Sequence, residues 1–178
     1  MSLETIKKLR EMTSVGINEC RKALGEANGD FDKALKALRE RGASIMEKKS
    51  GRTASQGLIE SYIHFSGNLG AIVEVNCETD FVARTEVFRK FAKDVAMQVA
   101  ACGAKYIKKE EVPDQALAKA ENAEEYKKQF CLLEQPFVKD TKLTVGGYLQ
   151  NVVAQTGENV VIKRFVRFAL GGNNDPEV

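Results

Sequence analysis

The chain has 178 residues, of which 43% are hydrophobic, so it is long enough for one packed domain plus a small accessory unit. Its 27 basic and 25 acidic residues give a net charge of +2, which is too balanced to indicate nucleic-acid binding from composition alone. No apolar run approaches the ~20 residues of a membrane helix, and the charged N-terminus lacks a signal-peptide core. Four cysteines with neither zinc-site nor disulfide-framework spacing indicate buried thiols in a reducing compartment.

Residues 1–42 predict three short helices. Apolar residues recur at helical spacing in each, and "TSVG" at 13–16 separates the first helix from the second. The pair Asn28-Gly29 supplies a stop for the second helix, Asp30 is expected to cap the third, and Gly42 fits just past its end. Because each helix is too short to persist alone, we expect them to pack as a bundle.

Residues 43–56 have weaker periodicity and predict a linker to a core domain at 57–172, followed by a tail at 173–178. Lys48, Lys49 and Arg52 in this linker are interpreted most simply as a solvated charge run.

Two alternating segments open the core, "LIESYIHF" at 58–65 and "LGAIVEVNC" at 69–77, and the turn signal "SGN" between them predicts a β-hairpin. After "CETDFVAR" at 77–84, "TEVFRKFAKDVAMQVAA" has apolar residues at helical spacing and predicts a long helix.

The rest of the core predicts a polar helical stretch at 105–135, a helix at 144–156 with Gly157 as its stop, and a final strand. In that strand the alternation places two sets of side chains on opposite faces: Val160, Ile162, Val166 and Phe168 on one, and Lys163, Phe165 and Arg167 on the other. Strands and helices do not alternate in βαβ units. The fold class is therefore predicted as α+β, with a helical bundle and then a three-stranded antiparallel sheet flanked by helices.

Little in the sequence points to catalysis, so we expect a protein that is not an enzyme and uses no cofactor or metal. His64 is the only histidine and lies in a strand pattern, and neither a phosphate-binding glycine loop nor a metal-spaced cluster occurs. The basic groups at 48–52 and at 163–167 could contact phosphates, but neither forms a stacking platform with aromatic residues. RNA binding, which would be steeply salt-dependent, is thus a weak alternative, and we expect neither nucleic acid nor membrane as a partner.

The segment "CETDFVAR" allows two interpretations from chemistry alone. In the simpler one, Phe81 fills the local core and Asp80 caps the following turn. In the other, the strand-to-helix corner displays Phe81 to a protein partner, which would also suit a tethered three-helix bundle.

Four segments together resemble elongation factor Ts, the exchange factor for elongation factor Tu: residues 9–35, 75–84, 132–140 and 157–168. The resemblance runs over nearly the whole chain and in the same order. It implies a ubiquitin-associated-like N-terminal bundle and a core with a three-stranded antiparallel sheet. Since the chain has room for one core subdomain, it resembles the short type, which implies a homodimer and a 2:2 complex with elongation factor Tu.

The resemblance also implies two sets of partner-binding residues. The family's Thr-Asp-Phe-Val segment matches Thr79, Asp80, Phe81 and Val82. By resemblance, Phe81 inserts between helices of the partner's nucleotide-binding domain beside Asp80, the partner's magnesium ion is lost, and GDP leaves. The bundle is implied to grip the same domain through the turn before its second helix and the start of that helix, at Thr13, Gly16, Ile17, Asn18 and Lys22.

Three expectations follow from this resemblance. Phe81 should be substantially exposed in the free chain. The helical arm at about 117–132 should be more compact than in the short members of the family, either because it is truly shortened or because residues are missing from the sequence. The protein should act in a bacterial cytoplasm, or in an organelle if it comes from a processed precursor. The alternative function is a ubiquitin-associated-like adaptor that binds helices or ubiquitin-like folds through residues 1–42.

Overall fold

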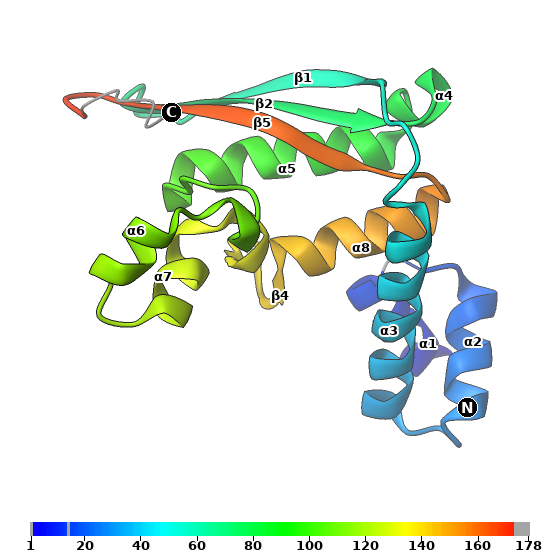
Figure 1. Cartoon of the computed structure of the whole chain (residues 1–178). Coiled ribbons are helices and arrows are strands. Elements are labelled where there is room, and N and C mark those ends of the chain that lie inside the picture. The colour runs from blue at the N-terminus through cyan, green and yellow to red at the C-terminus, as the bar shows by residue number, and fades with distance from the viewer. Residues whose placement is uncertain (1, 14, 173–178) are drawn as a thin grey trace.

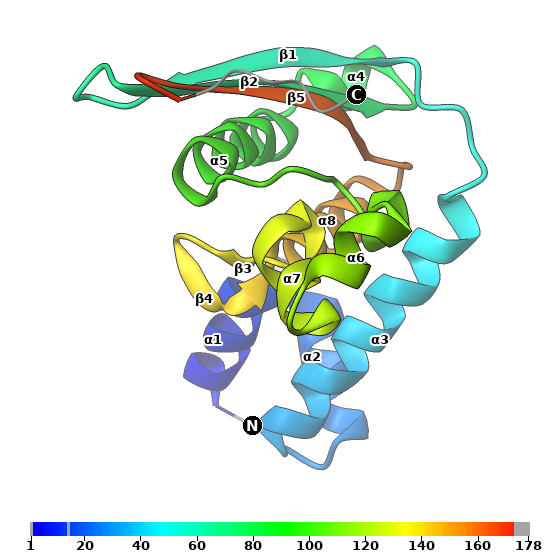
Figure 2. The same cartoon turned by 60° about the vertical axis from the view of Figure 1, so that its left-hand side comes forward.

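The computed structural model describes residues 2–13 and 15–172, and the predicted tail at 173–178 lies outside them. Figures 1 and 2 show a sheet as the upper layer, a helix directly beneath it, and an N-terminal bundle below one end of the sheet. The predicted α+β class, with N-terminal helices and a three-stranded antiparallel sheet flanked by helices, is confirmed. Within the described part of the chain, no helix combines the length and apolar character needed to cross a membrane.

The bundle consists of α1 (Leu3–Thr13), α2 (Ile17–Glu26) and α3 (Phe31–Lys49). The predicted cap is present, since a carboxylate oxygen of Asp30 accepts the main-chain N–H of Lys33 at 3.0 Å. The three helices bury a hydrophobic cluster of their own: Ile6, Leu9, Cys20, Ala23, Leu24, Ala34, Leu35 and Leu38.

The predicted end of the third helix at Gly42 was wrong. Helix α3 continues to Lys49 and so takes in half of the segment expected to be a linker. Gly42 is buried because it lies against α8, where a Cβ would be 3.8 Å from Gln150, and Ile45 and Met46 pack on the core beyond it. A glycine in a helical pattern marks a stop only when nothing packs against it, and here a neighbouring helix does.

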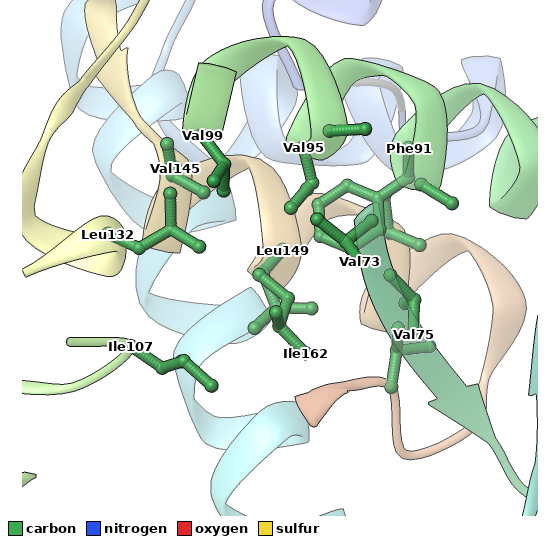
Figure 3. Packing of buried hydrophobic residues seen from close by; sticks show 14 of the residues in the cluster. Val73, Val75, Phe91, Val95, Val99, Ile107, Leu132, Val145, Leu149 and Ile162 are labelled. Carbon is green, nitrogen blue, oxygen red and sulfur yellow. The ribbon is translucent and has the colours of Figure 1, made fainter. Parts of the chain in front are cut away.

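The main sheet has the strand order β1-β2-β5, formed by β1 (Gln56–Ile63), β2 (Leu69–Cys77) and β5 (Val161–Ala169), all antiparallel. One face packs on α5 (Glu86–Cys102) and α8 (Val145–Thr156). Figure 3 shows side chains of both helices meeting the inward residues of β2 and β5: Val73, Val75, Phe91, Val95, Val99, Leu149 and Ile162. The predicted boundaries of α8 are confirmed, because Thr144 caps its start and Gly157 ends it in the left-handed conformation.

The predicted division of the last strand into two faces was wrong beyond Lys163. Glu74 pairs with Arg164 but Val75 pairs with Ile162, so Lys163 is an extra residue in a β-bulge. The bulge reverses the alternation: Phe165 packs on the core, while Val166 and Phe168 join Ile59, Ile63 and Ile72 as exposed apolar residues. We call the five residues Ile59, Ile63, Ile72, Val166 and Phe168 the outer sheet face; no described element covers it in either whole-chain view.

The polar stretch after α5 forms short pieces instead of long helices. These are two 3-10 turns (Lys109–Glu111 and Leu132–Glu134), α6 (Asp114–Lys119) and α7 (Ala123–Phe130). A small two-stranded sheet follows, β3 (Pro136–Phe137) with β4 (Asp140–Thr144), which the sequence did not predict because neither strand is long enough to show alternation.

Candidate functional site

The segment Thr79–Val82 forms a sharp corner between the sheet and α5. Strand β2 ends at Cys77, and the one-turn helix α4 (Asp80–Ala83) begins three residues later, at the right-hand end of the sheet in Figure 1. Thr79 has extended backbone geometry and is the N-cap of α4, where its hydroxyl oxygen accepts the N–H of Val82 at 3.4 Å. A second threonine cap, Thr85, starts α5 three residues after Val82.

Phe81 points away from the core and is 78% exposed, as the resemblance led us to expect. The inward positions of α4 belong instead to Ala83, which is buried, and to Val82, which packs against the main core cluster. The simpler interpretation of the corner, with Phe81 filling the local core, is therefore wrong. A phenylalanine this exposed gains little from folding, so its ring is free to contact another molecule.

Asp80 also differs from the simpler interpretation, because Thr79 provides the cap that we assigned to it. The Asp80 carboxylate instead forms an exposed ion pair with the Arg84 guanidinium, one turn later in the chain, at 2.8 Å. Exposed pairs of this kind are weak, so the carboxylate next to Phe81 can exchange its partner at little cost.

The corner is held from beneath by four residues that we call the clasp: Glu78, Thr79, Glu158 and Asn159. The Glu158 carboxylate accepts the main-chain N–H groups of Glu78 and Thr79, at 3.1 and 3.0 Å, and the Thr79 hydroxyl at 2.6 Å. In return, the Glu78 carboxylate accepts the main-chain N–H of Asn159 at 2.7 Å. This hydrogen bond, helped by the nearby Arg52, holds the pKa of Glu78 below its usual range.

Sequence reasoning did not select Glu158 or Asn159 as site residues, although both lie in a segment that carries the family resemblance. Their only sequence signal is a polar pair directly before an apolar strand, which is also typical of ordinary loop residues.

Cys77 closes the floor of the corner. Its thiol is buried and donates to the carbonyl oxygen of Thr79 at 3.1 Å, and burial together with the nearby Glu158 charge raises its pKa to about 11. The thiol is therefore protonated at neutral pH and behaves as a small packing group.

The bundle residues assigned by resemblance divide into two kinds. Gly16, Ile17, Asn18 and Lys22 are exposed at the start of α2, and Ile17 is 52% exposed although it is apolar. Thr13 is only 1% exposed, and its hydroxyl donates to the carbonyl oxygen of Leu9 at 2.7 Å. Its side chain therefore shapes the turn before α2 and offers no surface in this conformation.

The single histidine lies outside the strand in which we placed it. His64 directly follows β1, its Nδ1 is 3.2 Å from the Tyr62 hydroxyl, and its ring stacks at a tilt on Phe65. Among residues 2–13 and 15–172, no group of three or more histidine, cysteine, aspartate or glutamate side chains is placed to hold a metal ion.

Comparison with known proteins supports the same family as the sequence segments. The family model described as elongation factor TS matches residues 32–129 and 122–172. The elongation factor Ts of Caldanaerobacter subterraneus is 45% identical over 194 residues, covering 96% of this chain and 97% of the relative. That of Carboxydothermus hydrogenoformans is 42% identical over 191 residues, covering 94% and 88%, and that of an Anaeromyxobacter strain is 44% identical over 189, covering 93% and 86%.

An alignment over 194 residues is longer than this chain of 178, so it places gaps in this chain. The two segments matched by the family model overlap at 122–129, within the range of the predicted arm.

Because the family match covers most of the chain and relatives at 42% to 45% identity cover nearly all of it, the chain belongs to the elongation factor Ts family.

Proposed function

We propose that this chain is a guanine-nucleotide exchange factor for elongation factor Tu and acts by binding, without catalysing a chemical step. Membership of the family supports a role in translation elongation, and the bacterial relatives support a cytoplasmic location. The observation that carries the proposal is the 78% exposed ring of Phe81 on a capped, hydrogen-bonded corner beside Asp80.

In this mechanism the corner acts as a wedge. Phe81 inserts between helices of the partner's nucleotide-binding domain, and Asp80 enters beside it. Together they displace partner groups that hold the magnesium ion, so the phosphate site loses its counter-charge and GDP leaves. By linkage, GDP must weaken binding of the exchange factor by the same factor, which lets fresh nucleotide release it.

The energy required shows that Phe81 does not act alone. A thousandfold acceleration needs about 4 kcal/mol of differential stabilisation, whereas burial of one phenylalanine contributes roughly 1.5 to 3 kcal/mol. The remainder must come from other contacts that hold the distorted partner. The exposed apolar Ile17 at the start of α2, with Gly16, Asn18 and Lys22 around it, is our candidate for a second contact.

The test is the release of fluorescent GDP from elongation factor Tu in stopped flow. Phe81→Ala should abolish most of the stimulated release while the protein stays folded. Phe65→Ala is the matched control, because Phe65 is 94% exposed at the hairpin between β1 and β2, and it should behave as wild type. If Phe81→Ala stimulates release normally, the wedge is refuted and the adaptor role of the bundle becomes the better proposal.

We also propose that the outer sheet face is the homodimer contact that gives a 2:2 complex. Five exposed apolar side chains share this face, more than a single isolated apolar residue would explain. Of the charges on it, Glu74 and Arg164 pair with each other at 2.7 Å, and the bulged Lys163 beside them leaves this face with a small net positive charge that a second copy would have to accommodate. Light scattering should give a dimer mass that Ile72→Lys reduces to a monomer, whereas Leu3→Lys, at an exposed leucine of α1, should not. A monomer mass for the wild type at all concentrations would refute the dimer and leave the exchange proposal standing.

A further inference from the structure

We propose that Glu158 is a positioning residue for the Phe81 corner: through the clasp it fixes the direction in which α4 presents Phe81. This inference rests on the exchange function proposed above and extends it to a residue outside the Thr-Asp-Phe-Val segment. Glu158 lies 80 positions after Glu78 in the chain, two residues past the end of α8, and is half-buried.

The carboxylate of Glu158 fixes the first residue of the corner completely. One oxygen accepts two successive main-chain N–H groups, those of Glu78 and Thr79, and the other accepts the Thr79 hydroxyl. A hydroxyl has one proton, so donation to Glu158 leaves a lone pair of the Thr79 oxygen directed at the N–H of Val82. Glu158 thus sets both the main-chain direction at Thr79 and the cap that starts α4.

The second half of the clasp connects the corner to the bundle. Asn159 is buried, its main-chain N–H donates to Glu78, and its side-chain amide donates to the carbonyl oxygens of Arg52 at 2.8 Å and Ser50 at 3.5 Å. These two carbonyls directly follow α3, the last helix of the bundle. One network therefore joins the corner, the end of α8 and the attachment point of the bundle.

The remaining restraints on α4 are few, which is why the clasp matters for presentation more than for folding. The helix has a single turn, its cap bond is long at 3.4 Å, only Val82 and Ala83 pack inward, and another link is to Thr85, whose hydroxyl donates to the carbonyl oxygen of Val82 at 2.7 Å. A group that must enter a partner at a defined angle depends on such support, because a ring free to pivot loses binding energy to ordering.

The test measures exchange by the Glu158→Gln variant, whose amide keeps the shape but replaces one accepting oxygen with a donor. We expect the maximal rate of GDP release at saturation to fall by about tenfold, the effect of losing hydrogen bonds to a charged group. The half-saturating concentration should change much less, because the bundle contact is intact. Glu121→Gln is the matched control: the Glu121 side chain is exposed in the α6–α7 segment, at the opposite end of the molecule from α4 in Figure 1, and its rate should be unchanged.

A double variant separates positioning from a general structural defect. If Glu158 acts through Phe81, then Glu158→Gln should have almost no further effect in a Phe81→Ala background. Additive losses would overturn the inference, as would a normal rate for Glu158→Gln alone. In both cases a large effect of Phe81→Ala by itself would leave the proposed function standing.

If thermal melting shows that Glu158→Gln does not fold, variants of Thr79, which donates the hydroxyl hydrogen bond to Glu158, provide the test instead. Thr79→Val removes the hydroxyl that donates to Glu158, and Thr79→Ser restores it. We expect Thr79→Val to lower the maximal exchange rate and Thr79→Ser to recover it. Equal rates for the two variants would overturn the inference.

Discussion

Replacement of Phe81 by alanine should leave the stability of the free protein nearly unchanged, and this expectation tests the geometry on which the proposed function depends. Folding removes only about a fifth of the Phe81 surface from water, because 78% remains exposed. Full burial of a phenylalanine contributes roughly 1.5 to 3 kcal/mol, so the loss on truncation is about 0.3 to 0.7 kcal/mol. Alanine is the better helix former by about 0.5 kcal/mol, which offsets most of that loss.

Urea unfolding followed by circular dichroism measures this difference, with Phe91→Ala as the opposite case. Phe91 is fully buried between the sheet and α8, and its truncation should cost about 3 to 5 kcal/mol because it also leaves a cavity. A loss of more than about 2 kcal/mol for Phe81→Ala would mean that the ring packs in the protein's own core in solution. In that case it would not be available to a partner, and the wedge would be refuted independently of any exchange assay.

Four further predictions test the local geometry. Gly42→Ala should stabilise the protein by about 0.5 to 1 kcal/mol, because alanine favours a helix interior and its Cβ would meet α8 at an ordinary 3.8 Å. Gly57→Ala should destabilise it instead in the same urea experiment, since its Cβ would overlap a carbonyl oxygen of β2. Cys102 is exposed, so the prediction of four buried thiols was wrong for this residue, and its thiol should react with a disulfide reagent long before the buried Cys77. Equal labelling in a short pulse, mapped by mass spectrometry, would contradict the packing of the corner. Because a main-chain hydrogen bond lowers the pKa of Glu78, its stabilising effect is complete above the usual glutamate range and is lost as the pH falls through the lowered pKa. The unfolding free energies of wild type and Glu78→Gln should therefore differ at pH 7 and converge once the pH has fallen below the lowered pKa.

Local sequence patterns predicted most of the helices and strands, because alternation, turns and caps depend on residues that are close together in the sequence. The hairpin of β1 and β2 follows from alternation around a turn, and the bounds of α8 follow from a threonine cap and a glycine stop. The errors occurred where a distant neighbour decides the outcome. Gly42 continues a helix because α8 packs against it, and Lys163 bulges from β5, which reverses every later side chain.

The candidate site shows the same limit more sharply. A single aromatic residue in a one-turn helix has no periodicity, so its chemistry alone could not place Phe81 inside or outside. Phe81 lies outside because Val82 and Ala83 already occupy the side of α4 that faces the core. A helix of one turn cannot place a third side chain on that side. The family resemblance supplied the correct expectation, whereas the pattern of the residues did not.

The clasp could not have been predicted from spacing, because its two halves are about 80 residues apart and each looks like an ordinary loop. Its physical logic appears only when the halves meet. Two glutamates that would repel each other are each supplied with N–H or O–H donors from the opposite segment, and Arg52 also pairs with Glu78 at 3.4 Å. Such an arrangement requires both segments, because moving either one removes the hydrogen-bond donors of the carboxylate on the other. The direction of Phe81 is therefore a property of the tertiary fold and not of the four-residue segment that carries the ring, which is why a variant at Glu158 is as informative about this site as a variant at Phe81 itself.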